Sequence, residues 1–334
     1  MNIKLTAAAI LFTALIQTTG SAQSQGEFHL VETVLIEDVQ LSASLELEVI
    51  EEGFLILDKQ QKKIFYLTER GELLQSIGGE GRGPGEMEDP TSFLYHEGNI
   101  IVSDRSLSRV TVFDLEGELI HTFQSSPHAI DMAVIGDLLF LYNPFHLAGD
   151  IVSSYRIPTG TPVQEFRDVS EVQVRLKAGL MNTLFQGIEK IGNQLFVLSH
   201  PYELIVGIYN PDGELLNEYD PITDIYIPPE VPENFNPFTA PDRFSDYVKS
   251  SVLRFYAHDG QLYLIQSHFE SGDKFLDIYD MDMNRLTSES MNIGDLRPHT
   301  VGDDGYFYML SEMQPGENGS DYGVGIQKFE LVWN

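Results

Sequence analysis

Four polar side chains stand at matched places in a repeating sequence, and their types and spacing could form a binding site. Counting six residues back from each of six recurring glycines gives Leu47, Ser92, Ile130, Gln186, Arg254 and His299. If these positions begin strands around one axis, a hydroxyl, an amide, a guanidinium and an imidazole converge in a central channel. Convergent polar groups in a concave site are typical of ligand binding. The alternative is scattered hydration of a water-filled channel, and an alignment error of one residue would turn each side chain away.

Two further residues join the candidates for ligand binding at the channel or at one face of the molecule. His128, like His299, follows a proline just before an expected inner strand, which would place both near one mouth of the channel. Arg82, in a glycine-rich segment, is the other candidate. The histidines show no metal-ligand spacing such as H-x-x-x-H, so solvated rim residues are the default interpretation. A metal-binding or general-base role is the alternative.

Nucleophilic and phosphate chemistry have no recognisable anchor. The sequence holds no G-x-S-x-G elbow and no cysteine. The glycine-dense run from Gly78 to Gly85 lacks the Lys-Ser/Thr step of a P-loop, and the carboxylates in and after it would repel phosphate. Backbone turns with positive φ explain these glycines better. Asp58 and Asp104 recur at equivalent repeat positions, where we expect them to cap turns, with Arg109 available to pair with Asp104.

The elements that must position these side chains are short strands in six similar units. The anchors are Gly53, Gly98, Gly136, Gly192, Gly260 and Gly305. Each leads into a short apolar run that is followed by a second run, a turn and a third run. Units of about 40–50 residues with four strands each are typical of propeller blades. The pattern therefore predicts an all-β, six-bladed β-propeller, with no room for a seventh blade.

The sixth unit lacks its outer strand, because the chain stops after the run from Tyr322 to Val332. A spare strand, Phe28 to Ile36, precedes the first unit. Pairing the two would close the ring and satisfy backbone groups that would otherwise form an open edge. An unpaired N-terminal extension is the alternative.

The first residues have the features of a signal peptide. Lys4 precedes an apolar run from Leu5 to Ile16, and small residues up to Ala22 offer a cleavage site. This run is shorter than the roughly 20 residues needed to cross a bilayer. We therefore expect residues 1–22 to be removed and residues 23–334 to form a single propeller domain. With no cysteine for a lipid anchor, the periplasm or the medium is the expected location.

The charge balance limits the partners. There are 20 basic and 51 acidic residues, for a formal net charge of −31. Such a surface repels phosphate backbones, so nucleic acid is excluded as a partner, and no later stretch suggests membrane insertion. The acidic excess serves solubility or, alternatively, attracts cationic ligands or divalent ions.

Two insertions lengthen the junctions between units. Residues 221–250 are rich in proline and aromatics, and residues 167–184 form a shorter insertion. Long ordered loops on a rigid scaffold often carry binding surfaces. A functional lid and an inert packing loop are the two interpretations of 221–250, and the inert one is favoured for 167–184.

The segment Ile77 to Phe93, IGGEGRGPGEMEDPTSF, resembles the junction between blades in six-bladed propellers of the NHL-repeat type. The following segment, IIVSDRSLSRVTVFDLEGELIHTF, is similar to the rest of such a repeat. The resemblance is strongest over residues 53–124 and closest to exported, mostly uncharacterised propellers of Bacteroidota-like bacteria. It implies a six-bladed fold for the mature chain and does not name a reaction.

The sequence therefore predicts a non-catalytic, exported recognition propeller that presents a site for a small molecule or an exported protein on one face of the disc. No catalytic residue, metal ligand or cofactor is assigned. One alternative is a metal-dependent lactonase or esterase with a divalent cation in the channel. The other is a structural part of an envelope assembly, which would need a large apolar patch on its rim or sides.

Overall fold

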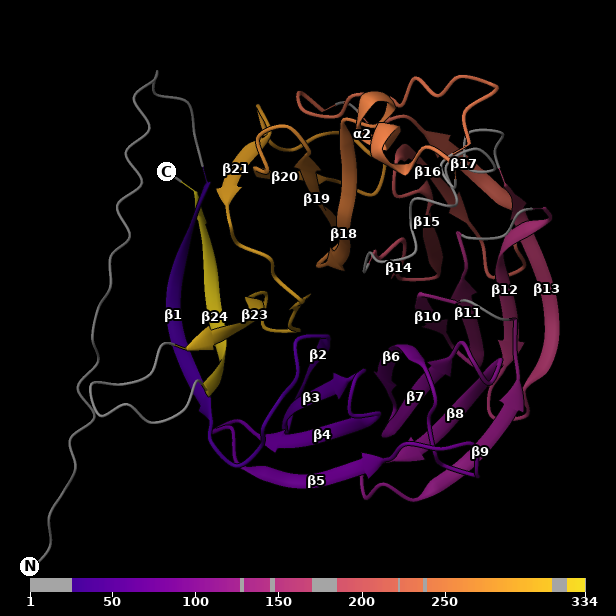
Figure 1. Ribbon diagram of the computed structural model, residues 1–334, viewed down its shortest axis with the longest axis vertical. Helices are drawn as coiled ribbons and strands as arrows, with labels where there is room; N and C mark the ends of the chain where they lie inside the picture. Colours follow the sequence, from indigo (N-terminus) through magenta and orange to yellow (C-terminus); the bar gives the residue numbers. More distant parts are fainter. Residues whose placement is uncertain are drawn as a thin grey trace, which may run out of the picture.

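The computed structural model describes residues 26–126, 129–144, 148–169, 185–221, 223–236, 239–313 and 323–333. These residues form six four-stranded antiparallel sheets arranged as blades around a central axis (Figure 1). The all-β, six-bladed propeller predicted from the repeats is confirmed.

Each of the first five blades takes four consecutive strands. Blade 1 contains β2 (Leu45–Ile50), β3 (Gly53–Asp58), β4 (Lys63–Thr68) and β5 (Leu73–Gly78). Blade 2 contains β6 (Pro90–His96), β7 (Asn99–Asp104), β8 (Arg109–Asp114) and β9 (Leu119–Gln124). Blade 3 contains β10 (Asp131–Ile135), β11 (Leu138–Tyr142), β12 (Asp150–Arg156) and β13 (Thr161–Asp168). Blade 4 contains β14 (Ile188–Ile191), β15 (Gln194–His200), β16 (Glu203–Tyr209) and β17 (Leu215–Tyr219). Blade 5 contains β18 (Ser250–His258), β19 (Gln261–His268), β20 (Lys274–Tyr279) and β21 (Met291–Gly294).

Blade 6 joins the two ends of the described chain. Its strands are β22 (Thr300–Val301), β23 (Phe307–Met313), β24 (Gly323–Trp333) and β1 (Gly26–Ile36), with β1 outermost. β1 runs antiparallel to β24 from the pair Gly26–Trp333 to the pair Ile36–Val324, with one bulge between Leu30 and Glu32. The N-terminal strand therefore supplies the edge that the last unit lacks, as Figure 1 shows.

The core lies between neighbouring blades, because each sheet buries both faces of its middle strands. All six residues of β3 are buried. Leu55 and Leu57 of β3 pack in one cluster with Phe93 and Ile100 of blade 2. At the closing blade, the ring of Phe28 meets Phe307 edge to face with centroids 4.8 Å apart.

Buried carboxylates fasten the segment that leads into a blade. Asp58 accepts hydrogen bonds from the backbone N–H and the hydroxyl of Ser42, at 2.8 and 2.6 Å. Asp104 accepts from the backbone N–H groups of Glu88 and Asp89 at 2.7 and 3.1 Å. Both carboxylates therefore order the path of the chain into the inner strand. They also cap the turn after their own strand, as predicted, because Asp58 accepts the backbone N–H of Gln61 and Asp104 that of Leu107, each at 2.9 Å.

The glycine-rich segment before blade 2 is held in place by hydrogen bonds from Arg109 to its backbone carbonyl groups. Arg109 donates to the carbonyl oxygens of Gly83 and Glu86, at 3.2 and 2.5 Å, where pairing with Asp104 was expected. Gly78 and Gly85 have φ values of 79° and 77°, a region that favours glycine. The segment is therefore a backbone turn, as predicted.

The described helical segments are η2 (Pro241–Arg243) and α2 (Phe244–Tyr247), both inside the 221–250 insertion. Neither has the length or the apolar composition that crossing a bilayer requires.

The pairing of β1 with β24 can be tested with proline, which lacks a backbone N–H. In an edge strand alternate N–H groups face the partner strand, so the double variant T33P/V34P must remove at least one ladder hydrogen bond. We expect it to lower the free energy of unfolding by about 3 kcal/mol or more, as measured by guanidinium denaturation. The T33S/V34T variant keeps both N–H groups and is the control. Equal midpoints for the two variants would contradict ring closure through β1.

Candidate functional site

The first strands of the blades surround the central axis of the ring, and we call the region that they enclose the channel. β2, β6, β10, β14 and β18 lie nearest the axis, and each contacts its neighbours around the ring (Figure 1). We call the end at which these strands begin the first mouth. The second mouth is the end at which hairpins connect them to the second strands.

The register of the hairpins shows which side chains stand at the same height in the channel. Ser92 of β6 and Arg254 of β18 each lie four residues before the end of the inner strand. The residues at the same height in blades 1, 3 and 4 are Glu46, Asp131 and Gly187.

The glycine count placed Leu47, Ile130 and Gln186 at this height, one residue away from the true matches. The cause is that the glycines are not equivalent. Gly98 is the second residue of its hairpin turn, Gly136 is the first residue of its turn, and Gly53 already belongs to the second strand. One step along a strand reverses the direction of the side chain, so the count missed Glu46 and Asp131.

Gln186 and His299 still lie at the first mouth, just before β14 and β22. The Oε1 atom of Gln186 is buried and has no hydrogen-bond partner among the described residues. Arg254 is half-buried and makes no hydrogen bond or ion pair with another described residue. The two groups come from blades 4 and 5 and leave hydrogen-bonding capacity unused.

His299 is held as a neutral hydrogen-bond donor. Its Nδ1 atom accepts the backbone N–H of Leu310 at 3.2 Å, so the proton of the neutral ring sits on Nε2. Burial, followed by the positive charge of Arg254, lowers the pKa of His299 to about 3. Arg254 and His299 are therefore close enough to interact electrostatically. The guanidinium of Arg254 and the Nε2–H of His299 can donate hydrogen bonds but cannot accept them.

The remaining predicted residues lie elsewhere. Ser92 is buried on β6 in blade 2. Arg82 is in the glycine-rich segment before blade 2, where it is exposed and forms an ion pair with Glu88 at 3.0 Å. His128 lies outside the described residues. The structure thus relates Gln186, Arg254 and His299 to one mouth and keeps Arg82 apart.

The channel also holds a group of carboxylates that the sequence reasoning did not single out. We call Glu46, Glu48, Asp131, Glu189 and Asp303 the channel carboxylates. Glu46 forms an ion pair with Lys59 at 2.6 Å. Asp131 accepts backbone N–H groups of Gly187 and Ile188 at 2.7 and 3.1 Å, which ties blade 3 to blade 4.

These carboxylates interact electrostatically although they come from different blades. Burial and then repulsion by Glu46, Asp131 and Asp303 raise the pKa of Glu48 to about 8. Burial raises the pKa of Asp131 to about 7, against the effect of its backbone hydrogen bonds. Burial raises the pKa of Glu189 well above its usual value, with Asp131 and Glu48 adding to the effect. Some of the channel carboxylates are therefore protonated, and hence uncharged, near neutral pH.

The second mouth opens into an acidic pocket of about 310 Å³. Its lining includes Glu48, Glu51, Glu52, Tyr95 and Asp303. Among the described residues, no three His, Asp or Glu side chains are arranged so that they could hold a metal ion. The second mouth is thus lined by carboxylates, whereas the first mouth combines Arg254 and the Gln186 amide oxygen, which have no partner among the described residues, with Glu46 and Asp131 at the height of Arg254.

The 221–250 insertion supports the first mouth through an apolar cluster. Phe185, Tyr202 and Val248 form its buried part, and Val231, Phe244 and Leu253 pack against it. Phe185 and Leu253 are the chain neighbours of Gln186 and Arg254. The insertion therefore fixes the backbone at two of the candidate binding residues.

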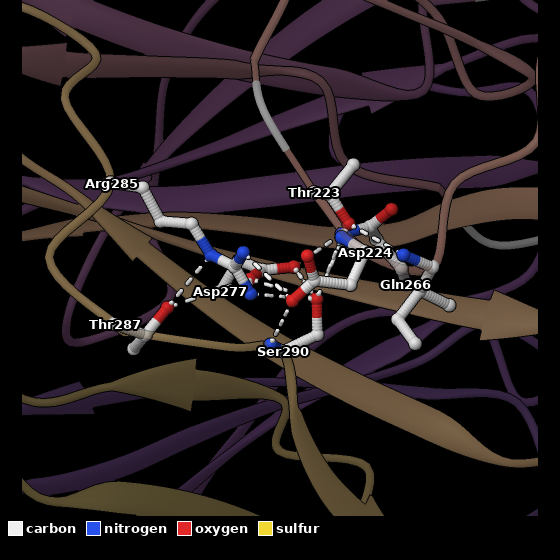
Figure 2. Close-up of polar contacts among 8 residues, drawn as sticks. Thr223, Asp224, Gln266, Asp277, Arg285, Thr287 and Ser290 are labelled. Atoms are coloured by element: carbon white, nitrogen blue, oxygen red, sulfur yellow. Dashed lines mark hydrogen bonds and ion pairs between the residues drawn. The ribbon is translucent and has the colours of Figure 1, made fainter. Parts of the chain in front are cut away.

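A buried ion pair fastens the start of the insertion to blade 5 (Figure 2). Arg285 contacts Asp277 at 2.7 Å and Asp224 of the insertion at 2.9 Å. Asp277, which is fully buried, also accepts from Gln266 at 2.7 Å, and Gln266 donates to Thr223 at 3.1 Å. The first residues of the insertion are thereby linked to β19 and β20.

The comparisons with known proteins agree with the fold. A family model described as a 6-bladed beta-propeller matches residues 27–148, from β1 into blade 3. A crystal structure of a protein named as exported, from Bacteroides fragilis, is 14% identical, covers 91% of this chain and 95% of its own, and has a TM-score of 0.65. A structure from Bacteroides vulgatus is 11% identical, covers 93% of this chain and 99% of its own, and has a TM-score of 0.62.

No curated protein matches the sequence. The chain is thus a six-bladed β-propeller that is similar to Bacteroides proteins of the same fold. Similarity at this level of identity carries the fold alone. The NHL-repeat type and the export signal stay predictions from the sequence.

The raised pKa of Glu48 predicts how stability depends on pH. The folded protein binds more protons than the unfolded chain between about pH 4.5 and 8, so this group destabilises the fold as pH rises through that range. We expect E48Q to raise the free energy of unfolding by up to about 4–5 kcal/mol at pH 8.5 and by little at pH 4. The measurement is urea denaturation across pH, with exposed Glu118 changed to Gln as the control. A gain that is equal at both pH values would contradict the assignment.

Removing Arg285 would leave the buried Asp277 carboxylate without its cation. We expect R285M to lower the free energy of unfolding by roughly 3–5 kcal/mol and to speed proteolysis within residues 221–228. R243M removes the exposed Arg243–Asp246 pair of the same insertion and should leave the free energy of unfolding nearly unchanged, because a solvated surface ion pair contributes little to stability. Similar losses in the two variants would show that the Asp277 network does not anchor the insertion.

Proposed function

We propose that this propeller is a non-catalytic, exported binding protein whose ligand occupies the first mouth of the channel, between blades 4 and 6. The observation that carries the proposal is the unpaired Arg254 guanidinium. Acidic residues outnumber basic ones by 51 to 20, yet no described carboxylate pairs with this half-buried cation. A cation that is partly withdrawn from water is stabilised by an anion or a hydrogen-bond acceptor, and a ligand would supply one at this position.

Two neighbouring groups support the same location. The Nε2–H of His299 is available as a donor, and the buried Oε1 atom of Gln186 is available as an acceptor. Buried polar atoms are normally satisfied, so the unsatisfied Oε1 atom of Gln186, just before the strand β14 that neighbours β18, favours a bound molecule. The insertion packs against the chain neighbours of Gln186 and Arg254, which fits a preformed site.

Binding is favoured over metal-assisted hydrolysis by the same groups. The polar atoms without partners at the first mouth are donors and an amide oxygen, which do not activate water by themselves. The export of the protein is supported by the apolar run at its N-terminus and by the name of the similar Bacteroides fragilis protein. The partner implied by this proposal is a small molecule in the periplasm or outside the cell.

The proposal is tested by a thermal-shift screen of sugars, sugar acids, amino acids and short peptides, followed by calorimetry of each hit. We expect a hit that is recovered chemically unchanged by mass spectrometry. R254Q should weaken its binding about 10- to 100-fold, because a charged hydrogen bond is lost.

The exposed Arg70, in the turn between β4 and β5, provides the matched control, and R70Q should bind like the wild type. Conversion of the hit to a product would overturn the non-catalytic assignment. Hits that bind R254Q as tightly as the wild type would place the site elsewhere.

A further inference from the structure

We infer that a cleft between the 221–250 insertion and blade 5 is a docking site for a segment of another protein, which inserts an apolar side chain flanked by lysine or arginine. The lining of the cleft includes none of the candidate residues of the first mouth, so this interaction goes beyond the proposed function. A cavity, the exposed apolar side chains beside it and the charges around it together indicate this partner.

The cleft has a volume of about 240 Å³ and lies between the start of the insertion and the hairpin that joins β19 to β20. Its lining is Asp224, Ile225 and Ile227 from the insertion and His268, Ser271 and Phe275 from blade 5. The volume is below the roughly 300–1,000 Å³ typical of pockets that enclose small-molecule ligands. A cleft of this size, with two isoleucines and a phenylalanine in its walls, suits a single apolar side chain of a partner.

Both walls of the cleft are held in place by hydrogen bonds. The hydroxyl of Ser250, at the start of β18, donates to the carbonyl oxygen of Ile225 at 3.3 Å and accepts the backbone N–H of Ile227 at 3.1 Å. On the other wall, the backbone N–H of His268 donates to the carbonyl oxygen of Asp273 at 3.1 Å and closes the hairpin. The cleft is therefore formed before a partner arrives, which lowers the ordering cost of binding.

Two exposed apolar side chains lie against the start of β18. Ile227 is 43% exposed and Phe269 is 39% exposed. The backbone N–H of Phe269 donates to the carbonyl oxygen of Lys249 at 2.9 Å, next to the Ser250 hydroxyl that binds Ile227. The ring of Phe269 also meets that of Tyr202 edge to face, with centroids 6.1 Å apart. Ile227 and Phe269 therefore form an ordered apolar rim, of the kind found at protein interfaces.

The charge around the cleft favours a basic partner. Residues 221–250 contain five acidic residues and two basic ones. Lys249, the basic residue beside Phe269, is already paired with Glu270 at 3.1 Å. Among the described residues, no cation pairs with Asp273 of the hairpin or with Glu230, three residues after Ile227. Positive charges on a partner would therefore meet carboxylates that the protein itself leaves uncompensated.

The same charge disfavours a second copy of this chain as the occupant. Each copy has a formal net charge of −31, so contact between two copies would bring like charges together around the cleft. A basic segment of a different protein avoids this repulsion and still supplies the apolar side chain.

Methyl NMR of the protein labelled at isoleucine tests the docking site, because Ile225 and Ile227 report on the cleft directly. Their signals are assigned with I225V and I227V. The probe is a capped heptapeptide with one leucine between two pairs of lysines. One control peptide has serine in place of the leucine, and the other has glutamates in place of the lysines. We expect the lysine–leucine peptide to shift both methyl signals and to bind about 10-fold or more tightly than either control.

Variants separate the apolar and the charged contributions. I227S/F269S removes the apolar rim and should weaken the lysine–leucine peptide about 10-fold or more. E230Q/D273N should reduce the advantage of this peptide over the glutamate peptide. The matched control, L74S/L216S, replaces two leucines of β5 and β17 that are 52% and 51% exposed, and should bind like the wild type. Circular dichroism melting confirms that each variant is folded.

Four outcomes would overturn the inference. The first is the absence of any shift of Ile225 and Ile227 with the lysine–leucine peptide at millimolar concentration. The second is equally tight binding of a control peptide or of I227S/F269S. The third is a set of shifts confined to Ile50, which would place the basic peptide in the acidic pocket of the second mouth. The fourth is a dimer in sedimentation analysis that I227S/F269S abolishes, because a second copy would then be the occupant. The screen that depends on Arg254 tests the first mouth separately, and none of these results decides it.

Discussion

The structure depends on the antiparallel pairing of β1 with β24. Every blade buries both faces against its neighbours, so no blade has a complete core until the ring is closed. Blade 6 has three strands from the end of the chain and gains its fourth from the beginning. The hydrogen bonds of this one pair therefore complete a cooperative unit in which the hydrophobic core is distributed over all six interfaces.

Closing the ring forces the inner strands to face one another, and this sets the chemistry of the channel. Side chains from distant parts of the sequence are brought within electrostatic reach, as the mutual effects of Glu48, Asp131 and Glu189 show. The carboxylates come chiefly from blades 1, 3 and 4, whereas the unpaired cation and the neutral histidine come from blades 5 and 6. The fold is close to sixfold symmetric, but the charged groups of its channel are distributed unevenly among the blades.

The repeats predicted the fold well because each blade is specified by residues that lie close together in the sequence. Turn residues and short apolar runs define each blade, and the missing last strand matches the extra first strand. The turn-capping role of Asp58 and Asp104 was also predictable, because an aspartate at the end of a strand accepts hydrogen bonds from backbone N–H groups a few residues further on.

The channel was harder to predict, because its register depends on the length of each hairpin. Gly53, Gly98 and Gly136 look alike in sequence but occupy three different positions relative to the turn. Aligning the last residue of each inner strand, which pairs directly across the turn, would have found Glu46 and Asp131. The ion pair of Arg285 with Asp224 could not be predicted from the sequence, since it joins residues that are distant along the chain.

The way the 221–250 insertion is fastened has a consequence for how a propeller with this architecture can diversify. Its start is bound through Asp224 to blade 5, and its end packs with Phe185 and Tyr202 of blade 4. Between these attachments, the described residues 232–236 and 239–243 belong to none of the hydrophobic clusters of the blades and include none of the polar groups named in the channel. Substitutions there can reshape the rim around the mouth while the floor keeps its geometry, so related propellers could acquire new selectivity without rebuilding their core.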